Sequence, residues 1–201
     1  MIRVLIAEDQ VLVRGALALL LELEPDIQVV AVVGDGDEVA DAAARTGPDV
    51  ALLDVRMPRV DGLTAAAELR VRSPGCRVVM CTGFDRPGYL TRAIEAGAVG
   101  FVLKDIPPED LLDTVRRVHD GERVIDPALA MRSVVTGPNP LTNRESQVVR
   151  IAADGGTIAE VAEKLHLSRG TVRNYLSSAI AKTGAGTRAE AARIADRFGW
   201  L

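Results

Sequence analysis

Three carboxylates, one hydroxyl and one ammonium stand at the ends of short apolar runs in the N-terminal half of the chain. Glu8 and Asp9 follow the first run, and Asp54, Thr82 and Lys104 follow later ones. Carboxylates gathered in one crevice repel one another and require a cation, and a small site of hard oxygen ligands favours Mg²⁺. A carboxylate beside Mg²⁺ can attack a phosphoryl group and form an acyl phosphate. The hydroxyl and the ammonium would then stabilise the transferred charge.

Each of these residues also has an ordinary structural interpretation. An acid pair after a strand can form the first turn of a helix, with Asp9 or Gln10 as its cap. Asp54 can be a loop acid and Thr82 a structural strand end. Lys104 can be a solvated charge, although it is one of only three lysines in a chain with 21 arginines. All of these residues occur at the ends of apolar runs, and this coincidence favours phosphoryl chemistry.

A parallel sheet would bring the ends of these runs together. Five continuous apolar runs alternate with segments of helical spacing, which predicts an α/β fold with a doubly wound, five-stranded parallel sheet of the flavodoxin-like kind. Neither a G-x-G-x-x-G after the first strand nor a P-loop motif occurs, so nucleotide binding of those types is not expected. The predicted strands are Ile2–Ala7, Gln28–Val33, Val50–Asp54, Arg77–Thr82 and Val99–Leu103. The predicted helices between and after them are Val11–Glu24, Glu38–Arg45, Leu63–Arg72, Tyr89–Ala96 and Glu109–Val118.

Composition limits the class of protein. With 201 residues and 48% hydrophobic residues, the chain can bury the cores of two small domains, which excludes disorder as its main state. No apolar run approaches the roughly 20 residues that span a bilayer, and the N-terminus does not resemble a signal peptide. Cys76 and Cys81 fit neither a disulfide framework nor a zinc pattern. We therefore expect a cytoplasmic protein with no direct membrane insertion.

The balance of charged residues and the spacing of apolar residues both change along the chain. Residues 1–122 carry 13 Lys and Arg against 21 Asp and Glu, whereas residues 123–201 carry 11 against 7. We predict a domain over residues 1–120, a linker over 121–138 and a second domain over 139–201. A short helix is possible within the linker at Pro127–Val135. The second domain is predicted to be all-α, with helices at Asn143–Asp154, Ile158–Lys164, Arg169–Thr183 and Arg188–Phe198.

Two helices of the second domain are separated by only three residues, which predicts a helix-turn-helix. Ser168 is placed to cap the second of these helices. No acid occurs between Lys164 and Arg188, and a carboxylate there would repel DNA phosphates. A generic helical hairpin with a solvated polar face is the alternative. The polar residues on the outer face of the second helix are Arg169, Thr171, Arg173, Asn174, Ser177 and Ser178.

Over residues 1–120 the chain resembles the receiver domain of two-component response regulators. The resemblance rests on the acid pair at Glu8, the segment D-V-R-M-P-R-V-D-G that begins at Asp54, Thr82 after V-V-M-C, and A-G-A-V-G-F-V-L-K-D across Ala96–Asp105. It implies that Asp54 is the phosphoacceptor and that Thr82 hydrogen-bonds the phosphoryl oxygens.

The same resemblance implies roles for further residues. Asp9 would bind Mg²⁺ directly, Glu8 would reach it through water, and the backbone carbonyl of Arg56 would complete the protein ligands beside Asp54. Lys104 would join Thr82 at the phosphoryl oxygens. Phe101 stands at the position of the family's switch aromatic, which is often tyrosine, so its inward rotation would rest on packing alone.

Residues 139–201 resemble the LuxR/FixJ-type DNA-binding domain. The match is carried by L-T-N-R-E at Leu141–Glu145 and by the segment Ile158–Ser177. It implies that Arg173, Asn174 and Ser177 face the major groove, with Arg169 and Thr171 near phosphates.

The whole chain therefore resembles a NarL/FixJ-type response regulator and is similar to the subgroup that contains DesR. This implies a DNA-binding transcriptional regulator, not an enzyme. A sensor histidine kinase would phosphorylate Asp54, and the homodimer formed would bind an inverted or tandem repeat in double-stranded DNA. One alternative is a phosphorylation-independent regulator or adaptor. A second is a Mg²⁺-dependent aspartyl phosphatase of the haloacid-dehalogenase kind, which needs an acid at the position of Arg56.

Overall fold

The computed structural model describes residues 1–83, 86–136, 139–153 and 155–201. The chain forms two compact units, one of Met1–Asp85 with Leu90–Met131 and one of Arg86–Tyr89 with Arg132–Leu201. Residues 137 and 138 of the predicted linker and Asp154 at the end of a predicted helix lie outside the described residues.

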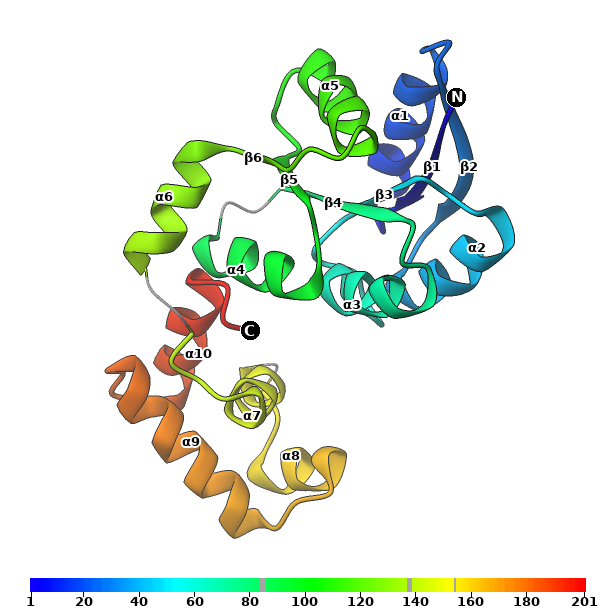
Figure 1. Cartoon of the computed structure of the whole chain (residues 1–201). Helices are drawn as coiled ribbons and strands as arrows, with labels where there is room; N and C mark the ends of the chain where they lie inside the picture. Colours follow the sequence, from blue (N-terminus) through cyan, green and yellow to red (C-terminus); the bar gives the residue numbers. More distant parts are fainter. Residues whose placement is uncertain (84–85, 137–138, 154) are drawn as a thin grey trace. The chain divides into compact units, whose positions relative to one another are not determined.

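The first unit is a parallel β-sheet with helices on both faces (Figure 1). Its strands follow the order β2-β1-β3-β4-β5-β6. Helices α1 and α5 cover one face of the sheet, and α2, α3 and α4 cover the other. The strands are β1 (Ile2–Ala7), β2 (Ile27–Val33), β3 (Val50–Leu53), β4 (Arg77–Thr82), β5 (Gly100–Leu103) and β6 (Val124–Ile125). The helices of this part of the chain are α1 (Val11–Glu22), η1 (Gly36–Glu38), α2 (Val39–Thr46), α3 (Gly62–Arg72), α4 (Pro87–Ala96), α5 (Pro108–His119) and α6 (Pro127–Thr136). The first residues of α4 and the last of α6 belong to the second unit.

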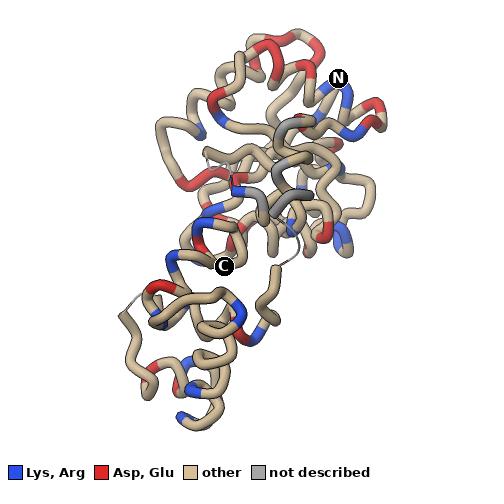
Figure 2. Tube along the Cα trace, turned by 90° about the vertical axis from the view of Figure 1, so that its left-hand side faces the viewer, with Lys and Arg blue, Asp and Glu red and all other residues tan. Residues whose placement is uncertain are grey.

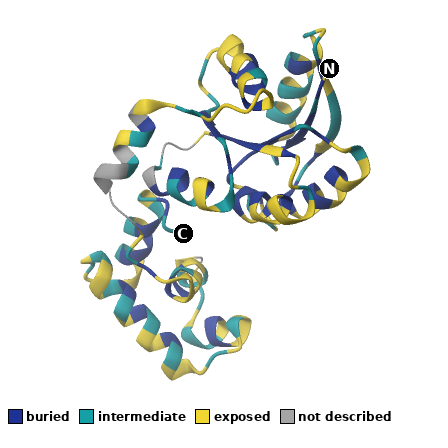
Figure 3. Ribbon diagram, viewed as in Figure 1, coloured by how far each residue is buried: buried dark blue, intermediate teal, exposed yellow. Residues whose placement is uncertain are grey.

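The central strands are buried on both faces, which is why they appear in the sequence as continuous apolar runs. All four residues of β3 are buried, and the central strands are mostly dark in Figure 3, whereas the helices also carry exposed residues. The register pairs Ala7 with Leu53 and Thr82 with Leu103. The strands therefore end at one edge, and the residues that follow them meet there.

The prediction of five strands is wrong by one. Val124 and Ile125 form β6, which pairs in parallel with β5 and sets Phe101 beside Ile125. A strand of two residues is too short to show an alternating or continuous apolar pattern, so the sequence predicts a linker at this segment. Over the residues that the structure describes, the sheet has six strands, and the short helix predicted after it is α6.

In the described part of the chain after α6, four helices surround an aliphatic core. Leu141, Val148, Val161, Val172 and Leu176 are among its buried residues. Among the described residues, no helix is both long and apolar enough to cross a lipid bilayer. The helices are α7 (Asn143–Ala153), α8 (Ile158–Leu165), α9 (Arg169–Thr183) and α10 (Arg188–Arg197).

Candidate functional sites

An acidic cluster lies at the carboxyl ends of β1 and β3. Carboxylate oxygens of Glu8, Asp9 and Asp54 all lie within 4.8 Å of one another. The sheet fixes this arrangement, because the Asp54 amide donates to the Ala7 carbonyl at 2.9 Å. Glu8 and Asp54 are almost fully buried, at 1% and 3% exposure. The three acids that sequence analysis selected are therefore brought together.

Lys104 is the cation of this cluster. Its Nζ lies 2.6 Å from Glu8 Oε2 and 3.2 Å from Asp54 Oδ2. The backbone amide of Lys104 donates to the Thr82 carbonyl at 2.9 Å, so β4 and β5 hold the two residues side by side. Thr82 is fully buried at the end of β4. The predicted set thus occupies one edge of the sheet.

The pKa values of the cluster are set first by the burial of its acids. Burial raises the pKa of both Glu8 and Asp54, and the mutual repulsion of these two acids raises that of Glu8 further. Burial opposes the charge of Lys104, but the hydrogen bond to Glu8 and the charge of Asp54 outweigh it and raise the pKa of the ammonium. The ammonium stays protonated, and the site favours a further cation.

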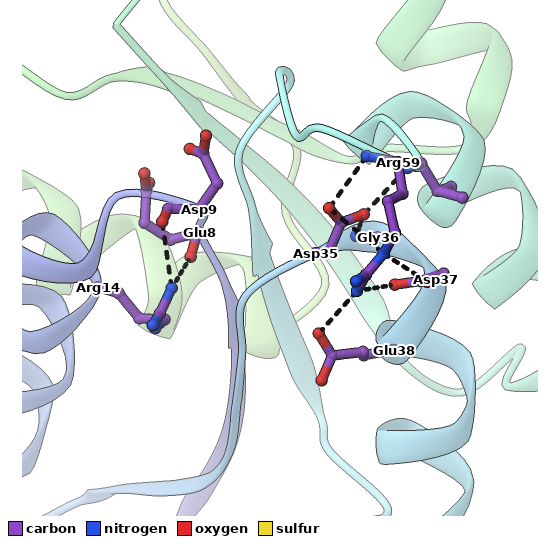
Figure 4. A network of polar contacts seen from close by, with 9 residues as sticks. Glu8, Asp9, Arg14, Asp35, Gly36, Asp37, Glu38 and Arg59 are labelled. Atoms are coloured by element: carbon purple, nitrogen blue, oxygen red, sulfur yellow. Dashed lines mark hydrogen bonds and ion pairs between the residues drawn. The ribbon is translucent and has the colours of Figure 1, made fainter.

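The loop between β3 and α3 is held by a residue that sequence analysis missed. Asp35 is buried at the end of the β2 segment, and its carboxylate accepts hydrogen bonds from the backbone amides of Arg59 at 3.0 Å and Val60 at 2.9 Å. Burial opposes ionisation, but these backbone bonds hold the pKa of Asp35 below its usual value. The Arg59 side chain also pairs with Asp37 and Glu38, and Figure 4 shows this network.

Arg14 is a second residue that sequence analysis did not select. From α1 its Nη1 donates to the backbone carbonyls of Glu8 at 2.6 Å and Asp9 at 3.3 Å (Figure 4). The Gln10 amide donates to Glu8 Oε1 at 3.1 Å, while the Gln10 side chain makes no capping hydrogen bond to α1. The acid pair is thus oriented from the helix side without serving as an ordinary helix cap.

Two further predicted residues lie near the cluster in sequence. Arg56 is exposed in the loop that follows Asp54. Phe101 is 2% exposed within β5 and is the largest of the fully buried side chains. It lines a pocket of about 470 Å³ together with Ile125 and Leu129.

The residues present fit Mg²⁺. Three carboxylates offer hard oxygen atoms, which are the ligands this ion prefers. Burial raises the pKa values of Glu8 and Asp54, and a further cation beside them would favour the ionised carboxylates. The chemistry of the donor set therefore agrees with a divalent cation at this edge.

The helix-turn-helix is built by a turn of left-handed backbone. His166 ends α8 with φ of 53°, a conformation that is uncommon for residues other than glycine. The Leu167 amide donates to the Ala162 carbonyl at 2.8 Å, which closes this turn. Ser168 then caps α9, because its hydroxyl accepts from the Thr171 amide at 3.0 Å. The predicted cap is confirmed.

The outer face of α9 is exposed and free of acids. Arg173, Asn174 and Ser177 are exposed, as is Arg169, whereas Val172, Leu176 and Ala179 are buried on the inner face. The Thr171 hydroxyl lies 2.8 Å from that of Ser168 and therefore takes part in the cap. Figure 2 marks the charged positions along the trace. An exposed helix with Arg and Asn at neighbouring positions has the donors and acceptors that read base edges.

Comparison with known families identifies a domain in each half of the chain. Residues 4–116 match the response regulator receiver domain, and residues 139–195 match the luxR family of bacterial regulatory proteins. The chain belongs to the LuxR family of response regulators. It is a transcriptional regulator with a DNA-binding domain and not an enzyme, so the phosphatase alternative is wrong.

Several relatives align with the chain over its whole length. The transcriptional regulatory proteins YvfU and DesR of Bacillus subtilis (strain 168) are 44% and 42% identical to the chain over 201 residues, with complete coverage of both sequences in each case. The response regulator RamR of Streptomyces coelicolor is 38% identical over 200 residues, covering 100% of this chain and 98% of its own.

Solved structures show the same architecture. The response regulator ChrA of a heme-sensing two-component system has a TM-score of 0.59 and 32% identity, with 100% of this chain and 98% of its own covered. The RcsB response regulator in complex with DNA has a TM-score of 0.65 at 23% identity and covers 98% of each chain. The latter likeness concerns the fold alone.

Proposed function

We propose that the chain is switched by phosphorylation of Asp54 from a sensor histidine kinase, and that the phosphorylated form dimerises and binds a repeated DNA site. The observation that carries the proposal is the placement of Asp54 within 4.8 Å of two further acids and 3.2 Å from Lys104. A lone loop acid would not need this arrangement.

Asp54 is the nucleophile of the transfer. One carboxylate oxygen forms a bond to phosphorus while the P–N bond of a phosphohistidine breaks, and the imidazole leaves with the electron pair and takes up a proton. Glu8, Asp9, Asp54 and the Arg56 carbonyl would hold Mg²⁺, with Glu8 acting through water. When bound, Mg²⁺ neutralises the charge shared by the carboxylates and the phosphoryl oxygens. The Lys104 ammonium, which pairs with the Asp54 carboxylate before the transfer, then pairs with the phosphoryl oxygens.

The switch follows from the new charge. The phosphoryl group adds oxygen acceptors that attract the Thr82 hydroxyl and the Lys104 ammonium. Thr82 lies on β4 beside β5, so movement there affects the packing of Phe101, and the pocket next to this ring gives room for repacking. Differences in packing of this kind shift an equilibrium between monomer and dimer.

DNA recognition rests on α9. Arg173, Asn174 and Ser177 face base edges in the major groove, and Arg169 and Thr171 lie near phosphates. A dimer places two such helices about one turn of DNA, ~34 Å, apart, which suits an inverted or tandem repeat. The exposure of these side chains and the absence of acids from Lys164 to Arg188 support this assignment.

The switch is tested with the full-length chain before and after treatment with Mg²⁺ and acetyl phosphate. We expect a shift from monomer to dimer in sedimentation velocity and a rise in DNA affinity of about 5–150-fold, the usual range for coupled sites. The DNA is a duplex recovered by selection from a random library. Identical sedimentation and affinity in fully phosphorylated and unphosphorylated samples would contradict the proposal.

Base reading is tested with Arg173→Ala. We expect a loss of about 1–3 kcal/mol in binding to the selected duplex and a smaller loss on sonicated bulk DNA, because a guanidinium fork to guanine discriminates between sequences. Arg144→Ala, an exposed arginine on α7, is the matched control and should leave the ratio of the two affinities unchanged. Equal losses on both DNAs would instead assign Arg173 to a phosphate.

A further inference from the structure

Three helices of the second unit begin with the same motif, a threonine followed three residues later by a glutamate. In each case the glutamate amide donates to the threonine hydroxyl, at 3.2 or 3.3 Å, as in a capping box. The helices are α7, α8 and α10. The pairs are Thr142 with Glu145, Thr157 with Glu160, and Thr187 with Glu190. Because all three glutamates lie at the same position of the same motif, Glu145 can be compared directly with Glu160 and Glu190.

Glu145 differs from the other two because it is buried and reaches a second helix. It is 4% exposed, whereas Glu160 is exposed. Its carboxylate accepts from the Thr142 amide at 2.6 Å, as a capping box requires. It also accepts from the Ser178 hydroxyl at 2.5 Å and the Lys182 ammonium at 2.7 Å, and both of these residues belong to α9. Capping alone needs neither contact.

We propose that Glu145 is a positioning residue that sets the rotation of the DNA-reading helix α9 about its own axis. In an α-helix, residues four apart lie on successive turns of one side. Asn174, Ser178 and Lys182 therefore share a side of α9, and Glu145 holds two of the three. Asn174, the next residue toward the N-terminus of this row, is exposed and faces the DNA in the function proposed above, on which this inference rests.

The apolar core alone fixes this rotation less tightly. Val172 and Leu176 on the inner face of α9 are aliphatic and contact a core of similar side chains, which tolerates small rotations. Two hydrogen bonds to one buried carboxylate do not tolerate such rotations, because each bond has a narrow range of distance and angle. A displacement of about 1 Å at a base-reading side chain is enough to break a bidentate contact.

Because of these contacts, the charge of Lys182 is not available to neutralise DNA phosphates. Burial opposes ionisation of Glu145, but the bonds from Lys182 and Ser178 lower its pKa to about 2, so the carboxylate is ionised at neutral pH. Lys182 pairs with this charge across 2.7 Å. Its charge is therefore used within the domain.

The test compares Glu145→Gln with Glu160→Gln in the full-length chain, all treated identically with Mg²⁺ and acetyl phosphate. Both variants keep a side-chain acceptor for their capping threonine, but only the first loses a charge that holds α9. Each protein selects duplexes from a random library, and binding to the duplex selected by the wild type and to bulk DNA is then measured. Circular dichroism confirms that each variant is folded.

We expect Glu145→Gln to relax or change the selected sequence and to lower the ratio of specific to bulk affinity about tenfold, the effect of one lost base contact. Glu160→Gln should select the wild-type sequence and change the ratio less than twofold. A folded Glu145→Gln variant that selects the wild-type sequence with an unchanged ratio would overturn the inference. Failure of the wild type to enrich any sequence would count against the proposed function instead.

Lys182→Met provides a second measurement that does not disturb the cap of α7. We expect the same relaxed selection, with the slope of log affinity against log salt on bulk DNA unchanged from the wild type. A slope smaller in magnitude by about 0.9 would mean that Lys182 contacts a phosphate, and the inference would then fail.

Discussion

Replacement of Asp54 by asparagine is expected to abolish labelling of the full-length chain by radioactive acetyl phosphate. Asparagine has nearly the same size as aspartate, but its amide is not a nucleophile and cannot form an acyl phosphate. The variant should remain folded and at least as thermally stable as the wild type. Burial raises the pKa of Asp54, so loss of its charge relieves a cluster in which three acids face one lysine.

Asp105→Asn is the matched control for this experiment. Asp105 is exposed and directly follows Lys104, so its replacement also removes one acid near the site while leaving the cluster intact. It should be labelled to the same extent as the wild type. Persistent labelling of Asp54→Asn at the wild-type level would place the phosphoacceptor elsewhere in the chain.

Replacement of Gly62 by alanine is expected to destabilise the first unit and to impair labelling of Asp54. A Cβ at Gly62 would stand 1.9 Å from the backbone oxygen of Asp54 and 3.1 Å from the Met80 side chain. The first distance is far below van der Waals contact, and the obstacle is backbone. The β3–α3 loop must move, at a cost of about 1–3 kcal/mol or more in the free energy of unfolding, as in other overpacked sites.

Gly15→Ala separates this clash from the general effect of adding a methyl group to a helix. Gly15 is exposed within α1, and a Cβ there meets no atom within 4 Å. Alanine should raise the free energy of unfolding by about 0.4–1 kcal/mol, because it restricts the unfolded chain and favours the helix. Urea unfolding of both variants measures the difference. Equal stability of the two would show that the close approach at Gly62 carries no cost.

The ends of the central strands could be predicted because burial on both faces leaves a clear trace in the sequence. Each central strand is a continuous apolar run, and the first polar residue after it marks the carboxyl edge of the sheet. Asp54 and Lys104 were identified in this way, and the structure brings them together. The turn between α8 and α9 was predicted for a similar reason, since the apolar spacing stops at Leu165 and Ser168 is a strong cap.

Other features left no local signal. The two residues of β6 are too few to show the apolar pattern of a strand. Their pairing with β5 depends on a sheet that is already formed. Asp35 lies in the segment G-D-G-D-E, which is typical of a turn, and its bonds to Arg59 and Val60 span more than 20 residues. The contact of Glu145 with Lys182 spans 37 residues, so the motif around Glu145 predicts a helix cap and nothing beyond it.

The scarcity of lysine has a practical consequence for spectroscopy. The chain has only three lysines, and they occupy three different settings: Lys104 in the acidic cluster, Lys182 beside Glu145, and the exposed Lys164 on α8. Isotope-labelled methyl groups attached to the amines would give one resonance for each lysine and one for the N-terminus. Events at the sheet edge and at the DNA-reading helix could then be followed separately in one sample, with Lys164 as an internal reference.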